Sequence, residues 1–170
     1  MIWIVNFSKN LRKNISPKAQ LSLLLPDIRS GFNVGAFFRT ADALGLDHIF
    51  LTGLTPYPPH KEIAKTALGA EKSVAWSYHI DAEKLLKKLK VDGVHIIALE
   101  RSTKAVALEK FMPKFPLCLI VGNEVQGIRE QLMNTAEEII EIPMRGSKES
   151  LNVSIAGSIA LWELAKKQYN

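Results

Sequence analysis

One arginine, Arg39, stands within a stretch of small and apolar residues, "NVGAFFRTADALG" (33–45). A helix turns about 100° per residue, so Arg39 lies away from the apolar face that Val34, Phe38 and Ala41 would form. The residues near it along the helix are small: Gly35, Ala36 and Ala43. Asp42 is its only possible partner within the helix. Two interpretations stay open: a surface Arg39–Asp42 pair, or a guanidinium placed to contact a ligand, an RNA strand or a second subunit.

Three polar loops directly follow apolar runs of strand length. They are residues 100–102, 123–127 and 145–150. In open α/β sheets, ligands bind beyond the carboxyl ends of the strands, where these loops would lie. Gly122 and Gly127 flank the second loop and let the backbone approach a ligand closely. The sequence therefore predicts a ligand site built from these loops.

Several standard motifs of catalysis are absent from the sequence. The loop "GNEVQG" lacks the Gly-Lys-Ser/Thr ending of a P-loop and does not match Gly-x-Gly-x-x-Gly. No Gly-x-Ser-x-Gly elbow is present. The four histidines are scattered, with no helical i, i+4 pair and no cysteine partner, so we expect no metal site. The chain offers a ligand site without a standard hydrolase or redox apparatus.

Strand-length apolar runs alternate with helical patterns along the chain. Strands are expected at 21–25, 48–52, 74–79, 94–99, 117–122 and 137–144. Helices are expected at 33–44, 61–68, 82–90 and 151–167. Asp81 is the expected cap of the third helix, and Ser150 and Asn152 are both good caps for the last. The alternation predicts an α/β fold, a mainly parallel sheet flanked by helices, in a single domain over residues 1–170.

The formal net charge of +5 is concentrated at the N-terminus. Residues 1–20 form a basic arm without an acidic residue. Its basic and aromatic residues are Lys9, Arg12, Lys13, Lys18, Trp3 and Phe7. Such an arm suits phosphate backbones and bases, although a solvated, frayed terminus is an equal interpretation.

The single cysteine, Cys118, lies in the apolar run "LCLIVG", which predicts a buried, inert thiol. One cysteine without a possible disulfide suggests a reducing compartment. No stretch approaches the roughly 18 apolar residues that a membrane span needs. We therefore expect a soluble, cytoplasmic protein.

Three longer stretches include Arg39 and two of the polar loops. They read "FNVGAFFRTADALG" (32–45), "LIVGNEVQGI" (119–128) and "IEIPMRGSKESLNVSIAGSIALWE" (140–163). In order and spacing they resemble the three motifs of the SpoU/TrmH class of RNA ribose 2′-O-methyltransferases in the SPOUT superfamily. The resemblance runs from about residue 21 to residue 167, nearly the whole chain. It implies a C-terminal deep trefoil knot, S-adenosylmethionine as cofactor, and a homodimer whose active site is completed across the interface.

The resemblance also implies roles for particular residues. Those that match the catalytic site of the family are Arg39, Asn33, Glu124, Ser150 and Asn152. The implied cofactor contacts are Leu99, Gly122, Ile142 and Leu151. The guanidinium of arginine only donates hydrogen bonds, so we expect it to bind the target phosphate and ribose rather than to take the proton.

The implied substrate is transfer RNA or ribosomal RNA. Transfer RNA is slightly favoured because only about 20 residues precede the first expected strand. Two alternatives remain: a catalytically silent RNA-binding protein of the same fold, and a nucleotide-binding α/β protein without an RNA role.

Overall fold

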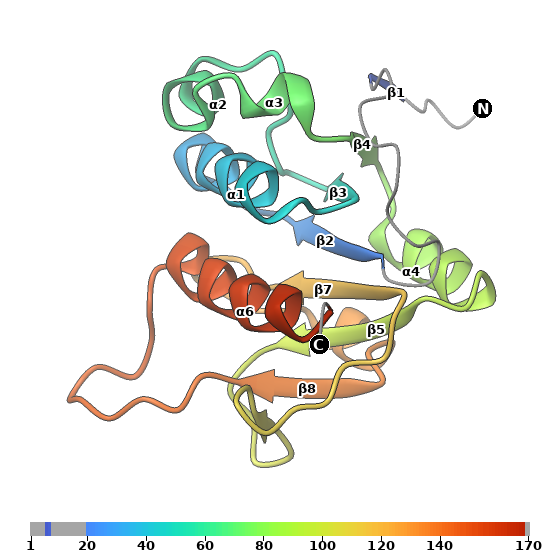
Figure 1. The fold of residues 1–170 in the computed structure, drawn as a ribbon, viewed down its shortest axis with the longest axis vertical. Coiled ribbons are helices and arrows are strands. Elements are labelled where there is room, and N and C mark those ends of the chain that lie inside the picture. The colour runs from blue at the N-terminus through green and yellow to red at the C-terminus, as the bar shows by residue number, and fades with distance from the viewer. Residues whose placement is uncertain (1–5, 8–19, 169–170) are drawn as a thin grey trace.

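The computed structural model describes residues 6–7 and 20–168, which form a sheet flanked by helices (Figure 1). The strands are β1 (Asn6–Phe7), β2 (Leu21–Pro26), β3 (His48–Thr52), β4 (Trp76–His79), β5 (His95–Leu99), β6 (Val106–Ala107), β7 (Leu117–Val121) and β8 (Glu138–Glu141). The helices are α1 (Gly31–Leu44), α2 (Lys61–Ala67), α3 (Ala70–Ser73), α4 (Ala82–Val91), α5 (Glu130–Met133) and α6 (Val153–Gln168).

The eight strands are ordered β1-β4-β3-β2-β7-β5-β8-β6, and only the β1–β4 pair is antiparallel. This arrangement confirms the expected mainly parallel α/β fold. The strand order reverses between β2 and β7, which pair in register from Leu21↔Leu117 to Leu24↔Ile120. Their carboxyl ends therefore meet at the switch point of the sheet, where α/β proteins bind ligands.

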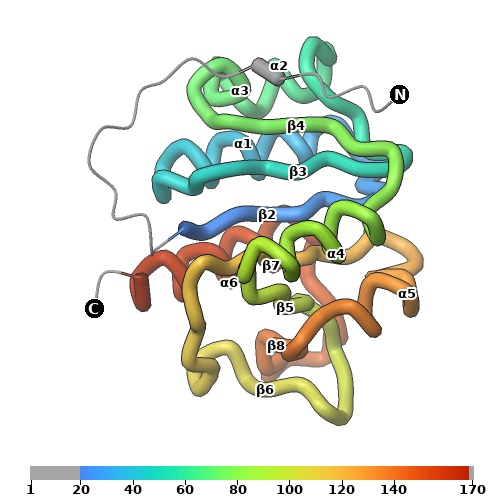
Figure 2. The backbone as a smooth tube through the Cα atoms, turned by 90° about the vertical axis from the view of Figure 1, so that its right-hand side faces the viewer, coloured from blue at the N-terminus to red at the C-terminus, as the bar shows by residue number. Residues whose placement is uncertain are grey.

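Side chains alternate between two cores, one on each face of the sheet. Leu23 and Leu119 pack with α1 and α6 on one face, and Leu24 and Cys118 pack with α4 and α5 on the other. Figure 2 shows α4 on the side of the strands nearer the viewer. Both faces of β7 are buried, which explains its continuous apolar sequence. Burial raises the pKa of the Cys118 thiol to about 12, and this confirms the expected inert cysteine.

Helix α1 begins two residues earlier than expected, because Ser30 caps it by accepting a hydrogen bond from the backbone N–H of Asn33. It ends at Gly45, whose left-handed φ of 72° few other residues adopt easily. The face formed by Val34, Phe38 and Ala41 is buried, as predicted. Helix α6 packs beside α1, where Gly157 leaves room for the ring of Phe37.

Most expected elements are present with shifted ends. The expected strand at 137–144 is shorter, since β8 ends at Glu141 and a long loop leads to α6 (Figure 1). The last helix begins at Val153 rather than at residue 151. The short elements β1, β6, α3 and α5 were not anticipated, because two to four residues carry no readable periodicity.

The basic arm, except for the strand β1 and Gln20, lies outside the described residues. The trefoil knot stays a prediction. Over residues 20–168, no helix has the length and apolar character needed to cross a membrane.

Candidate active site

A cavity of about 940 Å³ lies at the carboxyl ends of β5, β7 and β8, within the size range of ligand pockets. All four expected cofactor contacts line it: Leu99, Gly122, Ile142 and Leu151. Leu99 ends β5, Gly122 follows β7, and the other two lie at the two ends of the loop that joins β8 to α6. The three polar loops singled out from the sequence thus surround one space.

The loop after β7 is a tight turn that brings backbone to the cavity wall. Asn123 and Gly127 exchange two backbone hydrogen bonds of 3.0 Å each. The Asn123 side chain closes the turn, since its Oδ1 accepts from the N–H groups of Val125 and Gln126 at 2.9 and 3.1 Å. A Cβ on Gly122 would stand 2.7 Å from the carbonyl carbon of Gly127. Only glycine fits there.

Glu124, in this turn, holds the start of α1. Its carboxylate accepts hydrogen bonds from the backbone N–H groups of Arg29 (3.1 Å) and Ser30 (3.3 Å) and from Asn33 Nδ2 (2.9 Å). Partial burial raises the pKa of Glu124, but the hydrogen bonds from Asn33, Arg29 and Ser30 outweigh it, so the net pKa lies below its ordinary value. Glu124 is therefore an anion at neutral pH.

Asn33 continues this connection to α6. Its Oδ1 accepts from Asn152 Nδ2 at 3.2 Å, so Glu124, Asn33 and Asn152 form one hydrogen-bonded chain. The other end of the Asn152 side chain caps α6, since its Oδ1 accepts from the backbone N–H groups of Ser154 (2.9 Å) and Ile155 (3.4 Å). Of the two capping candidates, Asn152 is the cap. Ser150 lines the cavity and makes no hydrogen bond to another described residue.

Arg39 is exposed on α1 and does not line the cavity. Within residues 20–168 its guanidinium makes no hydrogen bond or ion pair. Of the two open interpretations, the structure does not show the Arg39–Asp42 pair, and the Asp42 carboxylate instead accepts a 2.6 Å hydrogen bond from the Ser73 hydroxyl of α3. Beside Arg39, Thr40 shares a 2.8 Å hydrogen bond with Ser158 of α6. The guanidinium is therefore free to contact another molecule.

The charge of the cavity lining is negative overall. Four carboxylates contribute to it, and only two cations do. They are Glu100, Glu124, Glu141 and Glu149, with Arg101 and Lys148. Such a lining favours a cationic ligand over one that carries several phosphates. Among the described residues, no group of three His, Cys, Asp or Glu side chains could hold a metal ion.

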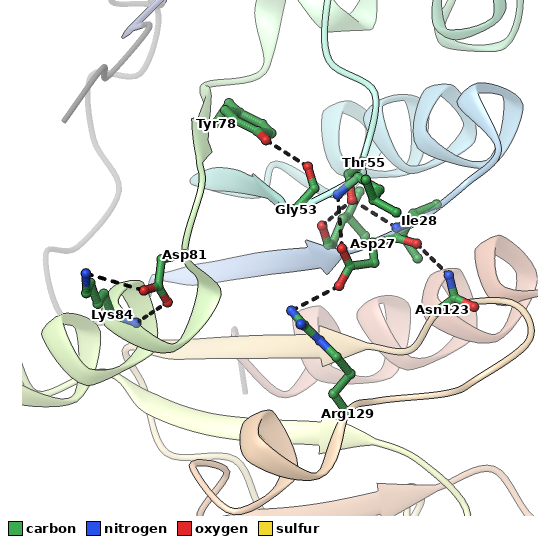
Figure 3. Close-up of polar contacts among 11 residues, drawn as sticks. Asp27, Ile28, Gly53, Thr55, Tyr78, Asp81, Lys84, Asn123 and Arg129 are labelled. Atoms are coloured by element: carbon green, nitrogen blue, oxygen red, sulfur yellow. Dashed lines mark hydrogen bonds and ion pairs between the residues drawn. The ribbon is translucent and has the colours of Figure 1, made fainter. Parts of the chain in front are cut away.

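Two side-chain contacts at this edge of the sheet were not anticipated from the sequence. Arg101 and Glu149 form a 3.1 Å ion pair that joins two of the loops. Asp27 pairs with Arg129 at 3.0 Å, and its backbone oxygen accepts a 2.6 Å hydrogen bond from Asn123 (Figure 3). Both contacts join residues far apart in the chain, and no local pattern indicates them.

Nearly the whole chain is similar to known proteins. Residues 20–162 match the SpoU rRNA Methylase family. The chain belongs to this family. In the SpoU family, a relative in Escherichia coli K12, tRNA (guanosine(18)-2′-O)-methyltransferase, is 30% identical over 150 residues. The match covers 88% of this chain and 65% of that relative, so the chain spans just under two thirds of its length.

Two solved structures are similar to this SpoU family chain. The AdoMet-bound rRNA methyltransferase from Sinorhizobium meliloti has 27% identity and a TM-score of 0.82, over 88% of this chain and 57% of that one. A second structure, solved for structural insights into the 2-OH methylation of C/U34 on tRNA, has 25% identity to this chain and a TM-score of 0.78. This match covers 89% of the chain and 97% of that one.

Proposed function

We propose that this chain transfers a methyl group from S-adenosylmethionine to a ribose 2′-hydroxyl of RNA. The observation that carries the proposal is the cavity, whose walls combine all four expected cofactor contacts with Glu124, Ser150 and Asn152. Membership of the SpoU family and the named activities of the relatives support it.

The cavity fits the proposed cofactor. Its volume of about 940 Å³ is ample for a nucleoside with an amino-acid tail. Leu99, Ile142 and Leu151 supply apolar surface, and the carboxylates suit the positive charges of a sulfonium and an amine. When bound, S-adenosylmethionine supplies a methyl group that is already activated by the sulfonium charge. The protein then has to position the hydroxyl and stabilise its oxygen while the hydroxyl proton passes to solvent water.

Arg39 is the proposed RNA contact at the reacting ribose. A guanidinium only donates hydrogen bonds, so Arg39 can bind phosphate and stabilise a developing alkoxide. It does not serve as a base. Asn33 and Asn152 orient the ribose, Glu124 holds the start of α1, and Ser150 lies beside the cofactor. Because Arg39 does not line the cavity of its own chain, it has to meet a cofactor that is bound elsewhere.

A homodimer brings such a second cofactor site close to Arg39. Helix α6, which packs beside α1, exposes Ile155, Ile159 and Trp162 at i, i+4 and i+7, with 54%, 43% and 62% of their surfaces accessible. This apolar stripe suits a second copy of the chain, and it adjoins the helix that carries Arg39. The proposed active site then combines the cavity of one protomer with Arg39 of the other.

The proposed substrates are transfer RNA and ribosomal RNA, with transfer RNA favoured. Two of the similar proteins are named for transfer RNA, and one of these matches over nearly its whole length. The basic faces of α4, with Lys84, Lys87 and Lys88, and the N-terminal arm are the proposed contacts to phosphates. A location in the cytoplasm stays a prediction from the sequence.

The proposal is tested by Arg39→Ala. We expect transfer of radiolabelled methyl groups to unmodified tRNA transcripts to fall about 10²- to 10³-fold, as on removal of one charge-stabilising donor. Calorimetric binding of S-adenosylmethionine and the dimer mass should stay unchanged. Lys72→Ala, which removes an exposed cation on α3, is the matched control. Near-normal turnover in Arg39→Ala would contradict the assignment.

Methyl-transfer and thermal-shift measurements on the wild type separate the alternatives. If the protein is a silent RNA-binding protein, the wild type will bind both the cofactor and RNA but will transfer no methyl group to the RNA. A nucleotide-binding protein would show its largest thermal shift with a phosphorylated nucleotide. The negative charge of the cavity lining disfavours such a ligand. Ribosomal RNA fragments assayed beside tRNA transcripts decide the substrate class.

A further inference from the structure

Asp27, the first residue after β2 in the segment that leads to α1, has an uncommon backbone conformation. Its φ is +54°, and only one other non-glycine residue in the described part of the chain, Leu68, has a positive φ. Side chains other than those of Asn and Asp avoid this left-handed region. A strained conformation of this kind persists only where the surroundings hold it.

Four contacts from other segments hold Asp27 in place, and Figure 3 shows two of them, those with Asn123 and Arg129. Its N–H donates to Thr52 O at 3.1 Å, and its Oδ1 accepts from Leu54 N at 3.0 Å. Its Oδ2 pairs with Arg129 at 3.0 Å, and its backbone oxygen accepts from Asn123 Nδ2 at 2.6 Å. Every polar group of the residue therefore has a partner, two of them near the end of β3 and two around the loop after β7.

The two ends of the Asn123 side chain connect Asp27 to the turn that carries Glu124. Nδ2 is bound by the Asp27 carbonyl, and Oδ1 holds the N–H groups of Val125 and Gln126. Glu124 lies within this turn and reaches back to the N–H groups of Arg29 and Ser30. Asp27 thus holds the turn from one side, and the turn holds the start of α1 from the other.

We infer that Asp27 is a positioning residue for methyl transfer, acting through Asn123 to fix Glu124 against the start of α1. The left-handed backbone of Asp27 aims its carbonyl at Asn123, and this sets the position of the Glu124–Asn33–Asn152 chain before RNA binds. The inference rests on the proposed function. The inference goes beyond the proposed function because Asp27 neither lines the cavity nor contacts Arg39.

Two substitutions at Asp27 test the inference, one that loses its side-chain contacts and its backbone preference and one that keeps most of both. Asp27→Ala removes the contacts to Leu54 and Arg129 and disfavours a positive φ. Asp27→Asn tolerates the left-handed conformation and keeps an oxygen for the Leu54 N–H. We expect Asp27→Ala to lower kcat about tenfold or more at saturating RNA and cofactor, while the Kd for S-adenosylhomocysteine changes less than about threefold. Asp27→Asn should recover most of that loss.

Amide hydrogen exchange gives a readout that does not depend on activity. In Asp27→Ala, protection should fall about tenfold at Arg29, Ser30, Val125 and Gln126, and stay unchanged in β2 and β7. Leu68→Ala, at the other left-handed residue, is the control and should change neither exchange nor kcat. A kcat within threefold of the wild type in a folded Asp27→Ala protein would overturn the inference. So would a loss of protection spread over the whole sheet.

If Asp27→Ala does not fold, Asn123→Asp decides the question. This variant keeps Oδ1 for Val125 and Gln126 but puts a second acceptor against the Asp27 carbonyl. It should show the same fall in kcat and in protection at Arg29 and Ser30, and wild-type values for both would refute the inference. If the wild type methylates no RNA, the proposed function fails, and the exchange pattern still decides whether Asp27 positions the turn.

Discussion

Asn152 has a structural task and a proposed catalytic one, and a single substitution separates them. Its Oδ1 caps α6, and its Nδ2 donates to Asn33 Oδ1. Aspartate is an equally good cap and suits the positive end of the helix dipole. Asn152→Asp therefore keeps the capping oxygen, replaces the donor to Asn33 by an acceptor and adds a negative charge, for which the serine variant below controls. We expect the thermal midpoint to stay within about 1 °C of the wild type.

The loss of the donor acts on activity through Asn33. The Asn33 amide donates to Glu124 and accepts from Asn152. In Asn152→Asp both neighbours are acceptors, so the amide can satisfy only one of them in either orientation. A net hydrogen bond of about 1.4 kcal/mol corresponds to a factor of about ten, so we expect kcat to fall at least about tenfold.

Asn152→Ala and Asn152→Ser complete the set. Alanine loses the cap as well, at about 1 kcal/mol, which lowers the thermal midpoint by about 2–4 °C in a chain of this size. Serine keeps a cap, adds no charge and is too short to reach Asn33, so it should behave as aspartate does. Differential scanning fluorimetry and methyl-transfer kinetics measure both effects. Wild-type kcat in Asn152→Asp would refute the catalytic reasoning, and a midpoint as low as that of Asn152→Ala would refute the capping reasoning.

Three further predictions concern pH, the cavity wall and the interface. Burial, with a smaller contribution from His79, lowers the pKa of His48 from 6.5 to about 4. The contribution of neutral His48 to the free energy of unfolding is therefore fully present above pH 6.5 and declines as the pH falls towards 4. The decline, at most about 3 kcal/mol, should be smaller in His48→Gln when urea unfolding is followed against pH. Gly122→Ala should weaken calorimetric S-adenosylmethionine binding about tenfold or more, because its Cβ collides with the backbone of Gly127; unchanged affinity contradicts the tight fit. Ile159→Asp should convert a dimer to monomers in light scattering, and an unchanged mass contradicts the proposed interface.

The fold was predictable because its signals are local. The apolar runs at β3 and β7 and the caps Asp81 and Gly45 each lie within one short segment, and each is present in the structure. The cavity was predictable for a related reason, since parallel strands bring the loops at their carboxyl ends together whatever the side-chain contacts are.

The contacts across the sheet were not predictable in the same way. Helical spacing offered Asp42 as one possible partner of Arg39, but Ser73 of an unanticipated helix binds it. The Asp27–Arg129 pair joins residues about 100 positions apart, and its geometry follows from a left-handed turn that no neighbouring residue indicates. Asn152 was recognisable as a possible cap, yet its bond to Asn33 depends on how α1 and α6 pack.

The pairing of β2 with β7 at the centre of the sheet has a consequence for how the chain folds. When the ribosome has made β2, α1 and β3, the inner edge of β2 has no partner until residues 117–121 have also emerged. Contacts between segments this far apart form slowly, because a long loop must close first. During synthesis, the apolar strand β2 therefore presents an open edge, which invites pairing with other chains. Completion of β7 closes that edge and brings the loops after β2 and β7 together, and β8 and the loop to α6 then add the rest of the cavity wall.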